Sequence, residues 1–334
     1  MTRVAWITFA APIRDPAGGL TSDVASLRYR VLAPARGLAE ADWSHAIVAN
    51  TGVDAAARDA AADADVLVFS KSVAVGNEAI TERARTAGRR VIFDICDDHF
   101  GHPRLGAHYR RMAGLADQVV CNTPAMAEAA APFAARPPVV IPDPYEGPGG
   151  AARFAPGARL KLLWFGHPSN LDSLQAELPG LIAFARARPL SLSVLTALTP
   201  RIVEVCAQVS AASQGALAMT AAPWSLPAQW SALAACDAVV IPSRATPGKR
   251  VKSANRMVEA LWAGRPVAAQ PMPAYAPFAA HTPVRPTLAE GLSDLLADPA
   301  AVPARIEAAQ ALIAADFAPR AIARQWASVL AARA

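Results

Sequence analysis

The sequence predicts an α/β protein built from two similar halves, each with a parallel β-sheet covered by helices on both faces. Short continuous apolar runs, which are typical of strands buried on both faces, alternate with helical patterns along the chain. The alternation stops at a Pro- and Gly-rich stretch, residues 142–158, and then starts again. A length of 334 residues leaves room for two domains, so the restart indicates a second α/β half.

The first half begins with the apolar run RVAWITFA at 3–10. Charged Arg14 and Asp15 follow it and no clean cleavage site is present, which favours a strand over a signal peptide. The later strands expected in this half are 45–50, 65–70, 89–96, 117–122 and 137–142, and the expected helices are 26–40, 77–87, 104–116 and one from Thr123 onward.

The second half follows a predicted linker, because residues 142–158 lack hydrophobic periodicity. The final helix, 319–333, places Ile322, Trp326 and Leu330 on one apolar stripe. The strands expected between linker and final helix are 160–166, 190–197, 216–222, 237–243 and 265–270.

The composition excludes several classes of protein. Hydrophobic residues make up 53% and charged residues 18%, which provides a large core and argues against disorder. No apolar run reaches the roughly 18–20 residues that cross a bilayer. The net charge of +5 comes without a basic stripe, so we expect no binding to nucleic acid. Neither GxSxG nor a Walker A sequence is present, so hydrolase and P-loop classes lack support.

Cysteine usage indicates the redox compartment. Cys96, Cys121, Cys206 and Cys236 show no CxxC spacing. Buried free thiols are therefore expected, not disulfides or a zinc site, and a cytoplasmic location is the simplest interpretation.

Candidate ligand-binding residues follow the expected strands, because open parallel sheets bind ligands at the carboxyl ends of their strands. Two such domains that face each other form a cleft. In the first half, Arg14, Arg28 and Arg30 come after the first strand, and Lys71 comes directly after the run 65–70. These cations could contact an acidic acceptor or phosphate groups, although an isolated arginine is usually solvated surface.

An acidic run, Asp97, Asp98 and His99, follows another strand of the first half. We expect these residues to be catalytic, with a carboxylate or the imidazole taking a proton from a substrate hydroxyl. Two alternatives are a helix N-cap formed by Asp97 or Asp98 and a divalent metal site. Of these possibilities we do not expect the metal site, because His102 and His108 nearby lack clear metal-ligand spacing.

A glycine turn, Gly166-His167-Pro168-Ser169-Asn170, follows the first strand of the second half. Such a turn lets backbone N–H groups approach a phosphate, and the next helix adds its positive end. The full GxGxxG spacing is missing, so a plain strand-to-helix turn is the alternative. Trp224, at the end of a later strand, could flank a nucleobase or fill the core.

The stretch KRVKSANRMVEALWAGRPVAA, 249–269, reads as an amphipathic helix with Ser253 as its N-cap. Lys252, Asn255, Arg256 and Glu259 fall on the side opposite the apolar stripe, whose expected members are Ala254, Met257, Val258 and Leu261.

Lys249 and Lys252 are two of only four lysines in the chain, and both come near the start of this helix, where an anion is favoured. Lysines for phosphates and Glu259 for ribose hydroxyls suit a nucleoside diphosphate. The alternative is a solvated face with a local Glu–Arg pair.

The segment DAVVIPSRATPGKRVKSANRMVEALWAGRPVAA, 237–269, resembles the GT-B glycosyltransferases of the group 1 type, which use nucleotide-sugar donors. Their E-A-x-x-x-G-x-P-V pattern is matched by Glu259-Ala260, Gly264, Pro266 and Val267. Many members carry a second glutamate eight residues earlier, where this chain has Val251. WFGHPSN resembles the family's glycine turn, VVIPDPYE its interdomain strand end, and the last helix the one that crosses back to the N-terminal domain.

This resemblance implies two Rossmann-like domains with parallel sheets that face each other across a cleft. Residues 1–145 would form the acceptor side and 146–316 the donor side, with 317–334 packing back on the first domain. From their places after the strands, we expect Arg14, Arg28 and Lys71 to contact an acceptor or phosphate groups. On the donor side, the resemblance implies that Glu259 contacts the ribose and that the turn of Gly166, His167, Ser169 and Asn170 faces the diphosphate. From their positions on the helix, we also expect Lys249, Lys252 and Asn255 to bind the donor.

The implied function is metal-independent, retaining transfer of a sugar from a nucleotide-diphosphate donor to a glycan, lipid or protein acceptor. No cofactor is expected besides the nucleotide sugar as co-substrate. No transmembrane segment is expected, and peripheral membrane association stays open. Two alternatives are a sugar-nucleotide epimerase of the same fold and a non-catalytic protein that binds a nucleotide or a partner.

Overall fold

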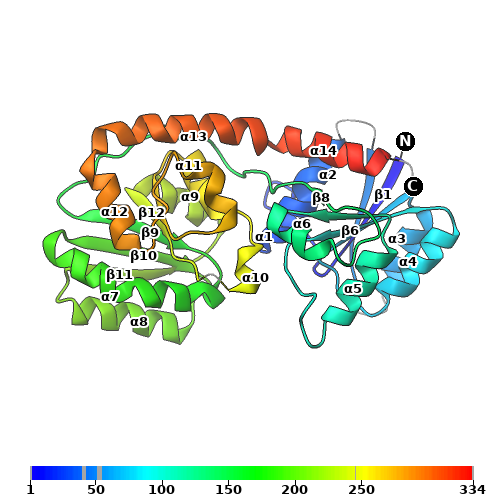
Figure 1. The fold of residues 1–334 in the computed structure, drawn as a ribbon, viewed down its shortest axis with the longest axis horizontal. Coiled ribbons are helices and arrows are strands. Elements are labelled where there is room, and N and C mark those ends of the chain that lie inside the picture. The colour runs from blue at the N-terminus through cyan, green and yellow to red at the C-terminus, as the bar shows by residue number, and fades with distance from the viewer. Residues whose placement is uncertain (1, 40–42, 51–54, 245, 333–334) are drawn as a thin grey trace. The chain divides into compact units, whose positions relative to one another are not determined.

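The chain divides into two compact α/β units in a computed structural model that describes residues 2–39, 43–50, 55–244 and 246–332 (Figure 1). Unit 1 comprises Met1–Pro144, Arg250–Ser253 and Asp316–Ala334, and unit 2 comprises Tyr145–Lys249 and Ala254–Ala315. Each unit has a parallel sheet, as the alternating strand and helix patterns predicted.

The sheet of unit 1 has the order β4-β1-β5-β6-β7-β8, and every neighbouring pair is parallel. The strands are β1 (Thr2–Thr8), β4 (Trp43–Ala49), β5 (Val66–Ser70), β6 (Arg90–Ile95), β7 (Gln118–Cys121) and β8 (Val139–Val140). A small antiparallel hairpin, β2 (Ile13–Arg14) and β3 (Leu20–Thr21), follows β1.

The helices of unit 1 largely follow the predicted pattern, with two exceptions: α3 (Ala55–Asp63) was not predicted, and one predicted helix is divided. The single helix expected at 26–40 is divided into α1 (Ala25–Leu27), a π-helical turn η1 (Arg28–Leu32) and α2 (Ala33–Ala39), and residue 40 lies outside the described residues. The other helices are α3 (Ala55–Asp63), α4 (Asn77–Thr86), α5 (Gly106–Leu115), α6 (Pro124–Ala130) and α14 (Pro319–Ala331).

Both faces of this sheet are buried, which explains why its strands are continuous apolar runs. Along β1, Ala5 and Ile7 belong to one hydrophobic cluster and Val4 and Trp6 to another. The first cluster includes residues of α3, α4, α5 and α6, and the second includes residues of η1, α2 and α14, such as Trp326. Successive side chains of a strand point to opposite faces, so each face has its own helical cover.

The core of unit 1 contains a buried ion network around Arg30, whose side chain is 1% exposed. The guanidinium contacts Asp94 at 2.6 Å and Asp143 at 3.1 Å, and Nη1 also donates to the carbonyl oxygen of Ile141 at 2.5 Å. The hydroxyl of Ser70 donates to Asp94 at 2.7 Å. Arg30 is therefore a structural residue and not the solvated cation that its isolation in the sequence suggested.

Unit 1 also takes four residues, Arg250–Ser253, from a part of the chain that is otherwise in unit 2. Val251 is 4% exposed and belongs to the hydrophobic cluster of unit 1 that contains Phe93 and Met126. The hydroxyl of Thr123 donates to the carbonyl oxygen of Val251 at 2.8 Å. The segment is thus fixed by both packing and a hydrogen bond.

The sheet of unit 2 has the order β11-β10-β9-β12-β13 and is also parallel. Its strands are β9 (Leu160–Phe165), β10 (Leu190–Thr196), β11 (Leu217–Pro223), β12 (Ala238–Ile241) and β13 (Val267–Ala269). Its helical segments are η2 (Pro168–Asn170), α7 (Leu171–Ala187), α8 (Pro200–Ala212), α9 (Leu226–Ala235), α10 (Pro247–Arg250, which ends in unit 1), α11 (Asn255–Trp262), η3 (Pro273–Phe278), α12 (Leu288–Ala297), η4 (Pro299–Ala301) and α13 (Val302–Asp316).

Two further expectations can be compared with the structure. The four cysteines are buried and free, as predicted. Among the described residues, no helix combines the length and apolar character that crossing a membrane requires.

Candidate functional site

Helix α11 begins one residue later than expected, and the hydroxyl of Ser253 does not cap it. Ala254 is at the N-cap position, with no side-chain hydrogen bond. Ser253 is the last residue of the segment in unit 1, so the helix begins only after the chain has returned to unit 2. The predicted apolar stripe is confirmed, because its members are buried: Ala254, Met257, Val258 and Leu261.

The glycine that follows α11 has a structural reason. Gly264 has a φ of +76°, and a Cβ at this position would lie 2.1 Å from the carbonyl oxygen of Ala151. Any other residue would clash and be strained there. This glycine of the E-A-x-x-x-G-x-P-V pattern is therefore explained by backbone packing within unit 2.

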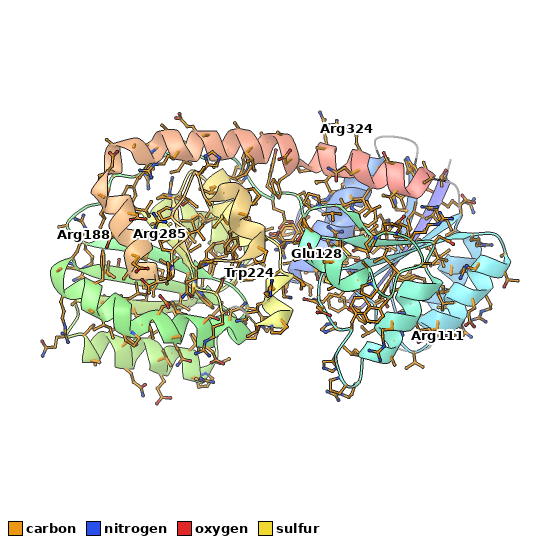
Figure 2. All side chains as sticks on the ribbon, viewed as in Figure 1. Arg111, Glu128, Arg188, Trp224, Arg285 and Arg324 are labelled. Atoms are coloured by element: carbon orange, nitrogen blue, oxygen red, sulfur yellow. The ribbon has the colours of Figure 1, made fainter. Side chains whose placement is uncertain are left out.

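Glu259 is buried, with 3% of its surface exposed, although the sequence pattern places it on a polar helix face. Gln229 of α9 lies over that face and donates from Nε2 to the Glu259 carboxylate at 2.7 Å. Oε1 of Gln229 accepts a hydrogen bond from the indole N–H of half-buried Trp224 at 2.8 Å (Trp224 is labelled in Figure 2). A chain of polar contacts therefore links Trp224 at the end of β11 to Glu259.

Arg256 is a site residue that the sequence analysis did not select. Its Nη1 is buried and has no hydrogen-bond partner within the described part of the chain. This nitrogen lies at the glycine turn, because a Cβ added to Gly166 would be 3.6 Å from it and 3.9 Å from the side-chain nitrogen of Asn170. Arg256 precedes Glu259 by three residues, a spacing that puts both on one side of α11 and could have identified it.

Lys249 approaches the helix that follows the same glycine turn. Its Nζ donates to the hydroxyl of Ser173 at 2.8 Å, and Ser173 is a buried residue in the first turn of α7. The sequence prediction that the Gly166 turn leads into a helix is confirmed by η2 and α7. An ammonium group, a guanidinium group and the positive end of a 17-residue helix thus come together within unit 2.

The remaining predicted donor residues in unit 2 lie around this turn. His167 is exposed, and its Nδ1 accepts from the backbone N–H of Ser169 at 3.2 Å and lies 2.8 Å from the Ser169 hydroxyl. The carbonyl oxygen of Gly166 accepts from the Thr196 hydroxyl at 2.7 Å. Asn255 is half-buried as the first residue of α11. Their predicted contacts with a donor remain predictions.

Lys252 is grouped with unit 1 residues and not with Glu259. Its Nζ forms an ion pair with Oδ1 of Asp97, while Nζ of Lys71 lies 2.6 Å from Oδ2 of the same carboxylate. Burial raises the pKa of Asp97, but Lys252 and Lys71 outweigh burial and lower this pKa to about 2. Asp97 is therefore ionised at neutral pH and holds two ammonium groups.

Asp98 and His99 have different surroundings from Asp97. No helix starts here, since α5 begins at Gly106, so the helix N-cap alternative is wrong. Asp98 instead accepts from the backbone N–H of Phe100 at 3.1 Å and closes a turn. Burial lowers the pKa of half-buried His99, and the opposing effect of Asp97 does not cancel that shift. The imidazole is therefore neutral at pH 7.

The contacts described for Arg14 and Arg28 are with residues other than Asp97, Lys71 and Lys252. Arg14 is in the exposed hairpin, where its guanidinium donates to the carbonyl oxygen of Gly18 at 2.9 Å. Arg28 is 2% exposed, donates to the carbonyl oxygen of Ser22 at 2.7 Å, and lies over the ring of Tyr29. Arg28 is therefore a buried residue of the η1 turn. Ligand contacts by either arginine remain predictions.

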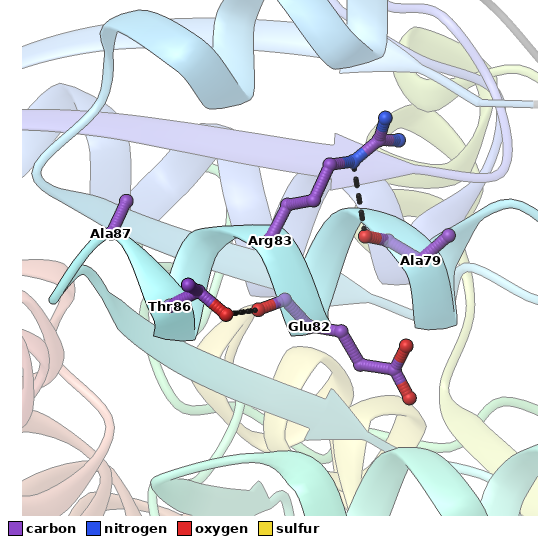
Figure 3. Close-up of a pocket in the computed structure, with 5 residues that line it drawn as sticks. All are labelled: Ala79, Glu82, Arg83, Thr86 and Ala87. Carbon is purple, nitrogen blue, oxygen red and sulfur yellow. Dashed lines mark hydrogen bonds between the residues drawn. The ribbon is translucent and has the colours of Figure 1, made fainter.

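A surface hollow is lined by residues of α4 and by Ala87, which follows that helix (Figure 3). Thr86 donates to the carbonyl oxygen of Glu82 at 2.9 Å and Arg83 to that of Ala79 at 3.2 Å, while the Glu82 carboxylate pairs with Arg111 of α5 at 2.5 Å. We assign this hollow no function. Nor do three His, Cys, Asp or Glu side chains gather as metal ligands anywhere in the described ranges.

The two units together form the GT-B fold. No protein-family model matches the chain, and no curated protein matches it in sequence. Solved structures do match in shape. The chain is similar to HepE from Anabaena, crystallised with UDP, with a TM-score of 0.69 and 15% identity over 98% of this chain and 99% of that one.

Two further solved structures have the same architecture. One is the lipopolysaccharide outer core galactosyltransferase WaaB, with a TM-score of 0.62 and 12% identity over 98% of this chain and 99% of that one. The other is a putative UDP-N-acetylglucosamine 2-epimerase from Listeria monocytogenes, with a TM-score of 0.57 and 13% identity over 98% and 95%. At these identities the similarity concerns the fold, which confirms the predicted GT-B class.

Proposed function

We propose that this protein is a glycosyltransferase that transfers a sugar from a nucleotide-diphosphate donor to an acceptor hydroxyl. The proposal depends above all on Arg256, whose buried Nη1 has no described partner and lies at the Gly166 turn. A buried guanidinium nitrogen without a partner is unfavourable unless a ligand supplies an acceptor. A diphosphate oxygen is a fitting acceptor, because arginine prefers phosphate and carboxylate groups.

The donor would bind in unit 2. Lys249 and the N-terminal end of α7 add positive charge beside Arg256. The diphosphate would face the turn of Gly166, His167, Ser169 and Asn170. Glu259 and Asn255, on the same helix as Arg256, would contact the ribose. Charge that develops on the leaving diphosphate would be stabilised by these fixed groups, which is where most of the rate acceleration would arise.

The acceptor would bind in unit 1, with His99 as the group that takes the proton from its hydroxyl. The imidazole is neutral at pH 7 because burial lowers its pKa, so it can accept a proton. Asp97 is a poor base by comparison, because two ammonium groups hold its pKa at about 2. Asp97 would instead orient Lys71 and Lys252.

We propose further that transfer requires neither a divalent metal nor a cofactor and retains the anomeric configuration. Lys249, Arg256 and the end of α7 supply positive charge of the kind that a metal would otherwise supply. Retention rests on the sequence resemblance alone. Full activity in EDTA supports the first point, and NMR of the anomeric proton in the fresh product tests the second.

The central test combines nucleotide binding with donor consumption. UDP is the first nucleotide to try, since HepE was crystallised with it. Calorimetry should show that Arg256→Met and Glu259→Ala each weaken UDP binding about tenfold or more. Arg201→Met is the matched control, because Arg201 is an exposed arginine of unit 2 that pairs with Asp172. Equal UDP affinity in all of these variants would mean that the donor site is misplaced.

Turnover distinguishes the proposal from its rivals. A glycosyltransferase should consume UDP-sugars faster when acceptor extracts are added. The similarity to a putative 2-epimerase favours one alternative, which predicts an epimerised nucleotide sugar with no acceptor present. Burial of Val251 at the family's glutamate position favours the other, a non-catalytic protein, which predicts UDP binding without any turnover.

A further inference from the structure

We propose that Lys71 and Lys252 bind an anionic group, a carboxylate or a phosphate, carried by the acceptor. This inference rests on the proposed transferase function, but its test does not. The two lysines are far apart in the sequence, and the fold of unit 1 brings both to one carboxylate, that of Asp97.

The charges at this cluster are unequal. Lys71 pairs with one oxygen of Asp97 and Lys252 with the other, so two positive charges share one negative charge. Each ammonium has three N–H donors, and Asp97 occupies one of them on each lysine. In the part of the chain that the structure describes, no other carboxylate pairs with these two lysines. Donors and net positive charge therefore remain for a ligand.

Exposure shows from which side a ligand would arrive. The Asp97 side chain is 10% exposed, whereas those of Lys71 and Lys252 are 30% and 51% exposed. The carboxylate thus forms the floor of the cluster and the ammonium groups face solvent. An incoming anion would meet the two cations before it met Asp97.

Lys71 is held in place in an unusual backbone conformation. It follows β5 with a φ of +50°, a left-handed value that is uncommon and unfavourable for residues other than glycine. Its Nζ also lies 5.4 Å from the centre of the Phe9 ring. Strained backbone of this kind clusters at functional sites, where the surrounding structure maintains it. The position of this ammonium group is therefore fixed before any ligand binds.

The surroundings decide which part of the reaction the cluster serves. His99 comes two residues after Asp97 and is neutral, and the Asp98 carboxylate is committed to the N–H of Phe100. An anionic substituent held by Lys71 and Lys252 would bring its own molecule close to His99. This arrangement favours an acceptor ligand over the donor role that the sequence suggested for Lys252, and it indicates an acidic or phosphorylated sugar as the acceptor.

The scarcity of lysine makes a direct test feasible. Protein labelled with ¹³Cε-lysine should give one signal for each of the four lysines, assigned by single substitutions. The probes are glucuronate and glucose 6-phosphate, with glucose as the neutral match. We expect both anions, but not glucose, to shift the signals of Lys71 and Lys252 and to leave Lys161 unchanged. The stronger of the two anions identifies the carboxylate or the phosphate as the natural group.

Variants test whether the lysines bind or only stabilise. Lys71→Met and Lys252→Met should each weaken binding of the better probe about tenfold, while Lys161→Met, an exposed lysine of unit 2, should not. Asp97→Asn should strengthen binding, because the ligand no longer competes with a carboxylate. If Asp97 only held the two lysines in place, Asp97→Asn would weaken binding of the probe. Circular dichroism verifies that each variant is folded.

Competition with UDP shows whether the two lysines bind an anionic group of the acceptor or the diphosphate of the donor. If the cluster serves the acceptor, glucose 6-phosphate should still shift Lys71 and Lys252 at saturating UDP. Displacement by UDP would assign the cluster to the donor diphosphate and overturn the proposal, as would shifts confined to Lys249. Absence of UDP binding with intact shifts at Lys71 and Lys252 would instead count against the proposed transferase function alone.

Discussion

Gln229 donates a hydrogen bond to the carboxylate of Glu259 over 2.7 Å, and both side chains are buried. The amide is oriented, because its oxygen accepts from Trp224 Nε1 while its nitrogen donates to Glu259. Gln229 therefore restricts where the Glu259 carboxylate can point, and acts as a positioning residue for the proposed ribose contact.

Replacing Gln229 should change how the protein responds to ribose hydroxyls. We expect Gln229→Leu to weaken UDP binding about tenfold, but to leave binding of 2′,3′-dideoxy-UDP nearly unchanged, because that ligand lacks the hydroxyls that Glu259 would contact. Calorimetry with both nucleotides measures this coupling. Gln208→Leu, at an exposed glutamine of α8, is the control. An equal loss for both nucleotides would indicate general damage to unit 2, not a positioning role.

Arg30 should be among the most important residues for the stability of unit 1. Arg30→Met leaves the buried carboxylates of Asp94 and Asp143 without their cation, and breaking a buried pair in this way costs about 3–5 kcal/mol. Chemical denaturation measures the loss. The control is Arg111→Met (Figure 2), an exposed arginine that pairs with Glu82, whose loss should stay within about 1 kcal/mol. Similar losses in both variants would contradict the role assigned to the network.

The sequence predicted the regular parts of this fold well, because strands buried on both faces leave a strong local pattern. The apolar stripe of α11 was predicted for the same reason. Lys252 and Val251 were harder to place, since they lie beside a helix of unit 2 but belong to unit 1. That assignment depends on contacts with Asp97 and Thr123, more than a hundred residues away, which no local pattern contains.

Two features of the site could not be predicted from the sequence, for similar reasons. Helical spacing placed Glu259 and Arg256 on a polar face, and spacing alone does not show that α9 covers that face with Gln229. The unsatisfied nitrogen of Arg256 is a property of its three-dimensional surroundings. Residue type and position thus identified the helix, and only the fold identified what each polar group contacts.

Restoring the family's glutamate at position 251 should harm this protein. Val251→Glu would bury an unpaired carboxylate in the hydrophobic cluster of unit 1, at a cost of at least about 3 kcal/mol. Val251→Thr has almost the same shape and should cost about 1–3 kcal/mol. Denaturation midpoints compare the two. A stable Val251→Glu protein with higher turnover would show that position 251 serves the donor after all.

Activity should depend on His99 through its neutral form. Because burial lowers the pKa of this imidazole, kcat/KM should be constant near neutral pH and fall as pH drops below the usual histidine range. His99→Gln should reduce kcat/KM about a hundredfold or more and abolish that acidic limb. His281→Gln, at a half-buried histidine of unit 2, should keep both the kcat/KM of the wild-type protein and its fall at acidic pH. A limb that persists in His99→Gln would assign the proton to another group.

The ion pairs of Asp97 predict how stability changes with pH. The pKa of Asp97 is lowered from 3.8 to about 2, so its contribution to stability is fully present above about pH 4 and is lost as pH falls toward 2. The size of the shift corresponds to about 2 kcal/mol. Asp97→Asn should therefore be less stable than the wild-type protein at pH 5, and the difference should shrink toward pH 2.

Denaturant unfolding of both proteins between pH 2 and pH 5 measures this convergence. Asp172→Asn is the control, because its side chain is 67% exposed and its ion pair with Arg201 should contribute less than about 1 kcal/mol. A gap between wild type and Asp97→Asn that stays constant over this range would mean that the carboxylate acts through packing alone. Convergence would show that Lys71 and Lys252 stabilise unit 1 through their ion pairs with Asp97. Because this single negative charge balances only one of the two ammonium groups, net positive charge remains for a ligand.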